Sequence, residues 1–253
     1  MRERIHCICL KKQVQITIVV LVGIAAGAAL LFAPHHAPEP VFQGKPASYW
    51  IARIDNDTVS QQNFKTTEGI TVLLRALECR NSKVGKIYLR LWHQLPTSMR
   101  KHVARPLDAQ VVRTHAIGTF FYWCAFETPL IEKEKLIMAA PGLVRALEDD
   151  DKNVRFMATS ALKVVSYHYP DISELVHGAL PALIERLQKD PDSNVRYMAT
   201  LALSLQRTFA RPAVPVLVAA LSDKDRRVRE CATNALIVID NKALPRRQPS
   251  EIK

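Results

Sequence analysis

The chain has 253 residues, of which 48% are hydrophobic and 23% are charged, and its formal net charge is +11. These proportions are ordinary for a globular protein, and about 200 residues suffice for one cooperative core. The five cysteines give little support to a disulfide framework, and the eight glycines and absent catalytic motifs exclude a phosphate-binding loop and the common hydrolase and metalloprotease sites. The sequence therefore predicts a non-enzymatic protein with no cofactor, no catalytic residue and no metal site.

A long apolar run lies near the N-terminus. Residues 16–33 are interrupted only by Thr17, Gly23 and Gly27, and this run is just long enough to cross a bilayer as a helix. Basic residues precede it, which predicts a cytoplasmic tail at 1–12, an uncleaved signal anchor at 13–33 and the rest of the chain outside. A cleaved signal peptide is the alternative. We expect a single-pass protein of the cytoplasmic membrane, with its bulk periplasmic or extracellular.

The anchor and the segment after it carry two further signals. Gly23 and Gly27 form a G-x-x-x-G pattern, which predicts a weak dimer through the membrane helix. Residues 34–46 contain four prolines and are predicted to be a stiff, extended spacer. Residues 48–54 should then form a short helix that caps the following domain.

Residues 47–241 are predicted to form one all-α solenoid of about four helix pairs. Its first pair is degenerate: residues 71–77 fit the pattern of a first helix, and residues 112–120 fit that of a second. From Leu77 to Val112 the chain advances 35 positions, where the later units need 7 or 8. About 27 residues have therefore been inserted into this turn.

The insertion, at about residues 80–109, holds seven basic residues and a single acidic one, Asp108. Apolar residues recur in it at helical spacing from Val84 to Leu95, which predicts a basic amphipathic helix that Pro96 ends. Such a helix could bind an anionic lipid surface or a nucleic acid, or it could be an ordinary capping helix that docks its apolar face on the first repeat. The candidate residues for an anionic surface are Lys83, Lys86, Arg90, Arg100, Lys101 and Arg105.

Three complete units follow, and each reads P-x-L-x-x-x-L, then an acidic turn, then V-R-x-x-A-x-x-A-L. They begin at Pro141, Pro181 and Pro215, and matching residues lie 40 or 41 apart and then 33 or 34 apart, the size of one helix-turn-helix repeat. The leucines of the first helix lie four apart on one face, and the small alanines of the second let two backbones approach closely. These faces can be buried only by stacking, so the sequence predicts a solenoid.

In each of these units a turn aspartate is followed after six residues by an arginine, and the pairs are Asp149 and Arg155, Asp190 and Arg196, and Asp223 and Arg229. Across residues 130–240 this pattern resembles the HEAT-repeat family, in particular the short bacterial form named after phycobiliprotein lyases. The resemblance implies that these residues form a structural ladder between stacked repeats and do no chemistry. Residues 40–50 look like the segment after the anchor in some bacterial membrane-tethered HEAT proteins.

The second helices also supply the candidate partner surface. Side chains just off the buried stripe occupy matching positions in three units, and they are Phe156, Ser160, Tyr197, Leu201, Glu230 and Asn234. If these helices line the inner curve, as in the HEAT family, Phe156 and Tyr197 stack in register as aromatic anchors for a partner. The alternative is that both rings fill gaps between neighbouring repeats.

We therefore expect a membrane-tethered scaffold that binds proteins, whose identity the sequence does not specify, on the outer face of the cytoplasmic membrane. One alternative is a lyase-like enzyme or enzyme subunit of the phycobilin lyase type, which only the family resemblance suggests. Another is a basic-groove nucleic-acid binder; the insertion suggests it, but a domain facing outward would rarely meet DNA. Residues 242–253 should form a flexible tail.

Overall fold

A computed structural model of the chain describes residues 23, 41–46, 49, 66–102, 108–126, 132–169 and 173–244. They fall into two units: residues 79–109 belong to one, and residues 41–78 and 110–244 to the other. Three predicted segments lie outside the described residues: the tail at 1–12, the anchor at 13–33 apart from Gly23, and the capping helix at 48–54 apart from Tyr49. Within the described ranges, no helix has both the length and the apolar character of a membrane span.

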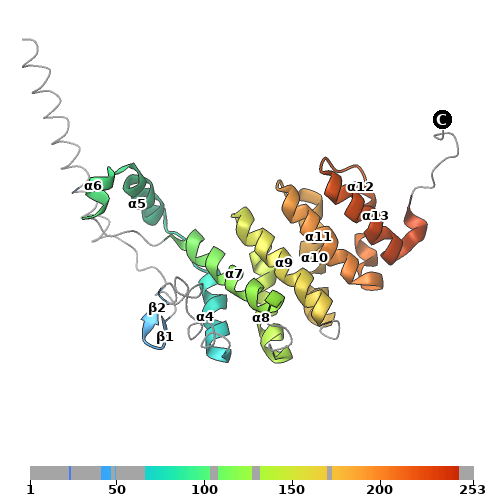
Figure 1. Cartoon of the computed structure of the whole chain (residues 1–253), viewed down its shortest axis with the longest axis horizontal. Helices are drawn as coiled ribbons and strands as arrows, with labels where there is room; N and C mark the ends of the chain where they lie inside the picture. Colours follow the sequence, from blue (N-terminus) through green and yellow to red (C-terminus); the bar gives the residue numbers. More distant parts are fainter. Residues whose placement is uncertain are drawn as a thin grey trace, which may run out of the picture. The chain divides into compact units, whose positions relative to one another are not determined.

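The larger unit consists of helix pairs. The first helices are α4 (Thr67–Leu77), α8 (Lys133–Ala146), α10 (Ser173–Lys189) and α12 (Val214–Ala220), and the second helices are α7 (Ala109–Phe126), α9 (Lys152–His168), α11 (Ser193–Leu205) and α13 (Arg226–Asp240). Each first helix packs on the next first helix in chain order, and α11 packs between α9 and α13. Figure 1 shows the pairs following one another in a row. The described part of this unit is thus the predicted all-α solenoid, with one hairpin added.

The predicted apolar stripes form its core. Leu143 and Leu147 of the second unit are buried, as are Ala158, Ala161 and Leu162 on the facing side of α9. The same positions are buried in the next two units, except that Leu221 is half-buried at the end of α12. A leucine face and an alanine face therefore meet in each pair, which explains why the helices stack closely.

The prolines that open each sequence unit do not open the helices. α8 begins at Lys133 and α10 at Ser173, so Pro141 and Pro181 lie inside them. Only Pro215 lies in the first turn of its helix, because the 3-10 helix η1 (Arg207–Ala213) precedes α12 there. A proline inside a helix removes one backbone hydrogen bond of that helix.

A short hairpin lies at the end of the predicted spacer. Strands β1 (Val41–Phe42) and β2 (Lys45–Pro46) pair antiparallel around Gln43 and Gly44, whose φ angles are both positive. Two positive φ angles suit a two-residue hairpin turn, and glycine adopts one without strain. Phe42 is buried and β1 packs on α4, so residues 41–46 are a packed element where the proline content predicted an extended one.

The smaller unit contains α5 (Lys83–Gln94) and α6 (Thr97–Arg100), with Pro96 between them as the sequence predicted. The Ser82 hydroxyl accepts from Gly85 N at 3.0 Å and caps the start of α5. At the other end, Arg100 Nε donates to Leu95 O at 2.8 Å, and its guanidinium lies 5.1 Å from the Trp92 ring centre. None of the α5 and α6 side chains whose exposure is described is buried.

Candidate functional site

Each acidic turn of the solenoid uses two aspartates in different ways. The second one caps the following helix: Asp151 Oδ1 accepts from Asn153 N at 2.8 Å, and Asp192 and Asp225 do the same for α11 and α13. The first one, Asp149 in the second unit, accepts from the backbone N–H of the capping aspartate at 2.9 Å. That contact holds its carboxylate in place toward the neighbouring unit.

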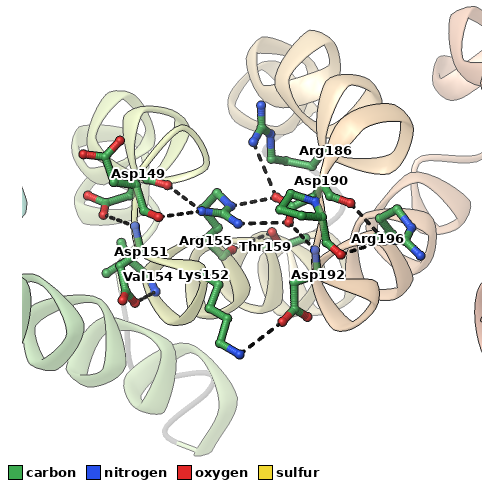
Figure 2. A network of polar contacts seen from close by, with 12 residues as sticks. Asp149, Asp151, Lys152, Val154, Arg155, Thr159, Arg186, Asp190, Asp192 and Arg196 are labelled. Carbon is green, nitrogen blue, oxygen red and sulfur yellow. Dashed lines mark hydrogen bonds and ion pairs between the residues drawn. The ribbon is translucent and has the colours of Figure 1, made fainter.

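The arginines connect adjacent units through these first aspartates. Arg155 Nε and Nη2 donate to the two oxygens of Asp190 at 2.7 and 3.0 Å, and its Nη1 donates to Asp149 O at 2.8 Å (Figure 2). Arg196 repeats this arrangement with Asp223, at 2.8 Å for both donors. The six-residue interval therefore reflects a bond to the backbone carbonyl, whereas the bidentate ion pair joins one repeat to the next. We call each such ion pair a rung.

A rung also connects the degenerate first unit. Arg113 Nη2 donates to Asp149 Oδ1 at 3.1 Å, and Nε lies 2.8 Å from Oδ2. Arg113 is the arginine of the V-R pair in its unit, so the V-R pattern alone could have predicted this rung. The first unit has no aspartate six residues before that arginine, so the six-residue interval could not. At the other end, Arg229 Nη1 donates to Asp223 O at 2.7 Å, but no carboxylate of the described residues accepts from its Nε or Nη2.

The central rung, between Arg155 and Asp190, is buried, and its hydrogen bonds shift the pKa of the arginine. The Arg155 and Asp190 side chains are 8% and 0% exposed, and the hydrogen bond to Asp190 is the main cause of a raised pKa of Arg155. In the next rung, the hydrogen bond from Arg196 lowers the pKa of Asp223. Paired and buried in this way, the rungs stabilise stacking and leave no free acid or base.

A threonine that follows the arginine in each of the last three units was not anticipated from the sequence. Thr159 Oγ1 donates to Arg155 O at 2.7 Å, and Thr200 and Thr233 repeat the bond to Arg196 and Arg229. The bond satisfies a hydroxyl that faces the neighbouring repeat, since Thr159 and Thr200 are fully buried. The threonine four residues after Arg155, Arg196 and Arg229 was the available signal, although Arg113 has Ile117 at that position.

The two candidate aromatic anchors lie in matching positions on α9 and α11. Phe156 and Tyr197 are both half-buried, so part of each ring is accessible. The Arg227 guanidinium of the next unit lies 5.4 Å from the Tyr197 ring centre. Tyr197 therefore contributes to packing between repeats as well as to the surface.

Ser160 does not belong to an accessible surface. It is 3% exposed, whereas the matching Leu201 is half-buried and Asn234 is exposed. Ser160 is thus buried where its counterparts in the next two units keep some exposure, although α11 has a second helix on both sides. This burial argues against the prediction that Ser160 contacts a partner.

In the last unit, Glu230 is exposed and accepts from Arg226 Nε at 2.6 Å. Together with Asn234 it gives this end of the row a polar character, in contrast to the aromatic rings of α9 and α11. A partner that covered the whole row would meet aromatic, aliphatic and polar groups in turn.

The candidate anionic-surface residues of the insertion divide into three groups. Lys83, Lys86 and Arg90 are exposed on α5, and Lys101 is exposed after α6. Arg100 binds carbonyls at the end of α5 and covers Trp92, so its charge is used inside the unit. Arg105 lies outside the described residues.

Within the described ranges, no three histidine, cysteine or carboxylate side chains are grouped to hold a metal ion. The thiols of Cys124 and Cys231 are buried, and burial raises the pKa of both, that of Cys231 to about 11. Thiols with such pKa values stay protonated at neutral pH and are poor nucleophiles. Both cysteines therefore belong to the buried core.

The stacked pairs, capped turns and rungs define an α-solenoid repeat protein. Residues 133–204 and 180–246 each match the family of HEAT repeats, which supports membership of that family. No curated protein matches the chain.

Three solved structures have a likeness to the chain. One is an engineered protein (TM-score 0.46, 20% identity, 76% of this chain and 78% of that one). Another is a designed armadillo repeat protein in complex with the peptide (KR)4 (TM-score 0.47, 18% identity, 77% and 91%). A further designed armadillo repeat protein has a TM-score of 0.45 at 16% identity over 79% and 96%.

Proposed function

We propose that the protein is a non-enzymatic scaffold whose HEAT repeats bind another protein. The observation that carries the proposal is the row of matching positions on the second helices, where the half-buried rings of Phe156 and Tyr197 recur one repeat apart. Aromatic rings that are held rigidly yet partly accessible provide binding energy at low entropic cost, and they dominate many interfaces.

The proposal includes a membrane tether. The support for it is the uncharged run at 16–33 preceded by basic residues, which is the pattern of a signal anchor with its N-terminus in the cytoplasm. In this arrangement the solenoid lies on the outer face of the cytoplasmic membrane, and the partner is an envelope protein. A dimer through Gly23 and Gly27 would double the number of solenoids at one place.

The proposal is tested by proximity labelling in the native membrane, with the labelling enzyme fused after Lys253. We expect a reproducible set of envelope proteins in the wild type and its loss in the double variant Phe156→Ala, Tyr197→Ala. The matched control is Tyr167→Ala, Phe209→Ala, which removes the same two ring types from exposed positions outside the row.

Circular dichroism melting of both variants separates binding from folding. The scaffold function is contradicted if the labelled set is the same in the row variant as in the control. Labelling of cytosolic proteins alone would contradict the tether and its orientation while leaving protein binding intact.

A further inference from the structure

One face of α5 combines three cations with an aliphatic side chain. Lys83, Lys86, Ile87 and Arg90 are spaced by three or four residues, so they lie along one side of the helix. All four side chains are exposed, and Ile87 is 56% exposed. We call these four residues the basic face.

Among the described residues, no acidic side chain neutralises the cations of the basic face. The single acidic residue described there is Asp108, whose Oδ1 accepts from Asn81 Nδ2 at 3.0 Å. No carboxylate of the described residues forms an ion pair with Lys83, Lys86 or Arg90. Neighbouring like charges on one helix face repel each other, and an anionic surface would relieve that repulsion.

Residues of α6 and its end extend the same chemistry. Lys101 is exposed, and Met99 is an exposed apolar side chain at 39%. Arg100, in contrast, is bound to the end of α5 and fixes how the two short helices follow one another. The unit therefore presents cations and isolated apolar side chains together. They lie on α5, on α6 and just after it, and Arg100 fixes the turn between the two helices.

The exposed apolar groups decide which anionic partner fits. A bilayer surface accepts cations and apolar side chains side by side, because its headgroups lie directly over hydrocarbon. A single-stranded nucleic acid would use stacking on accessible aromatic rings, but the Trp92 ring is only half-exposed and lies beside the Arg100 guanidinium. A duplex would bind the cations through its phosphates and would leave the exposed Ile87 and Met99 without an apolar partner. We infer that the basic face of α5, with α6, binds the anionic headgroups of a lipid bilayer.

This contact is a membrane interaction separate from the protein-binding row. It deepens the proposed tether, since a chain anchored by one helix would gain a second contact that depends on lipid charge. It does not require residues 13–33 to span the bilayer, because the comparison that tests it is between two lipid compositions.

The test is hydrogen–deuterium exchange of the full chain, reconstituted with phosphatidylcholine alone or with an equal mixture of phosphatidylcholine and phosphatidylglycerol. We expect amides of residues 83–102 to exchange more slowly only with the anionic lipid, and high salt to remove the effect. In the variant Lys83→Gln, Lys86→Gln, Arg90→Gln the protection should disappear. Each cation near an anionic bilayer strengthens binding about five-fold, so the loss of three lowers the affinity roughly a hundredfold.

The matched control is Lys133→Gln, Lys224→Gln, Lys242→Gln, which removes three exposed charges from the solenoid and should leave the protection unchanged. The inference is overturned by equal exchange with both lipids, or by protection that survives in the basic-face variant or is lost in the control. Protection by a DNA duplex without protection by phosphatidylglycerol would also overturn it and would assign the face to nucleic acid. None of these outcomes depends on whether a protein partner binds the row.

Discussion

Replacing Asp190 by alanine breaks the most deeply buried rung. The substitution removes both acceptors of Arg155 Nε and Nη2, a contact at 3.4 Å from Arg186, and the acceptor for Asp192 N. The Arg155 side chain, 8% exposed, then keeps a positive charge without its ion-pair partner. Breaking a buried ion pair in this way costs about 3–5 kcal/mol.

The solenoid provides an internal comparison for that magnitude. Arg145 and Glu78 also join neighbouring units, at 2.7 Å, but their side chains are 58% and 57% exposed. Water and salt screen such a pair, so Glu78→Ala should cost about 0–1 kcal/mol. Both variants lose one carboxylate, which makes the degree of burial the main difference between them.

The measurement is thermal and urea unfolding followed by circular dichroism. In a chain with about 200 ordered residues, 3–5 kcal/mol corresponds to a fall in melting temperature of roughly 6–20 °C, against a few degrees at most for Glu78→Ala. A variant in which both Arg155 and Asp190 are replaced by apolar residues should recover part of the loss. If Asp190→Ala were no more destabilising than Glu78→Ala, burial of the rung would not be what holds the repeats together.

Three other predictions concern the turns and the core. The hydrogen bond from Arg196 lowers the pKa of Asp223 in the folded state, so the ionised carboxylate stabilises the fold above the pKa it has in the unfolded chain. This stabilisation is lost as pH falls below about 4. Asp223→Asn should therefore flatten the fall in melting temperature at acid pH, and an unchanged slope would contradict this. Asp151→Ala should remove the cap of α9 and lower stability by about 1 kcal/mol, whereas Asp151→Asn, which keeps the acceptor, should cost much less by urea unfolding. Iodoacetamide should leave Cys124 and Cys231 unmodified until the protein unfolds, because burial raises the pKa of both thiols; rapid modification of the native protein, read by peptide mass spectrometry, would show that the core opens.

Most of the solenoid could be predicted because its sequence repeats. Leucines and alanines at helical spacing specify which faces must be buried, and the recurrence of an acidic turn locates the helix ends. The insertion helix was predictable as well, since Pro96 ends it and apolar spacing defines its face. In these cases a local pattern determines the local structure.

Features that depend on neighbours were harder to predict. Pro141 and Pro181 open their sequence units, yet α8 and α10 begin eight residues before them. Ser160 has the same repeat position as the half-buried Leu201 and the exposed Asn234, so position within the repeat did not reveal that it is buried. The hairpin at 41–46 could not be predicted, because its two-residue strands are too short to show strand periodicity and lie in a proline-rich segment.

Arg229 Nε and Nη2, which donate to no carboxylate of the described residues, bear on where unfolding of the solenoid begins. Each inner helix pair packs against a pair on both sides, whereas α13 has a second helix, α11, on one side only. No carboxylate among the described residues accepts from Nε or Nη2 of its Arg229. Because each repeat contacts only its neighbours, unfolding can start at this C-terminal end and advance one helix pair at a time. The C-terminal pair would then be the first to exchange its amides and the first to meet a protease, well before the inner pairs loosen.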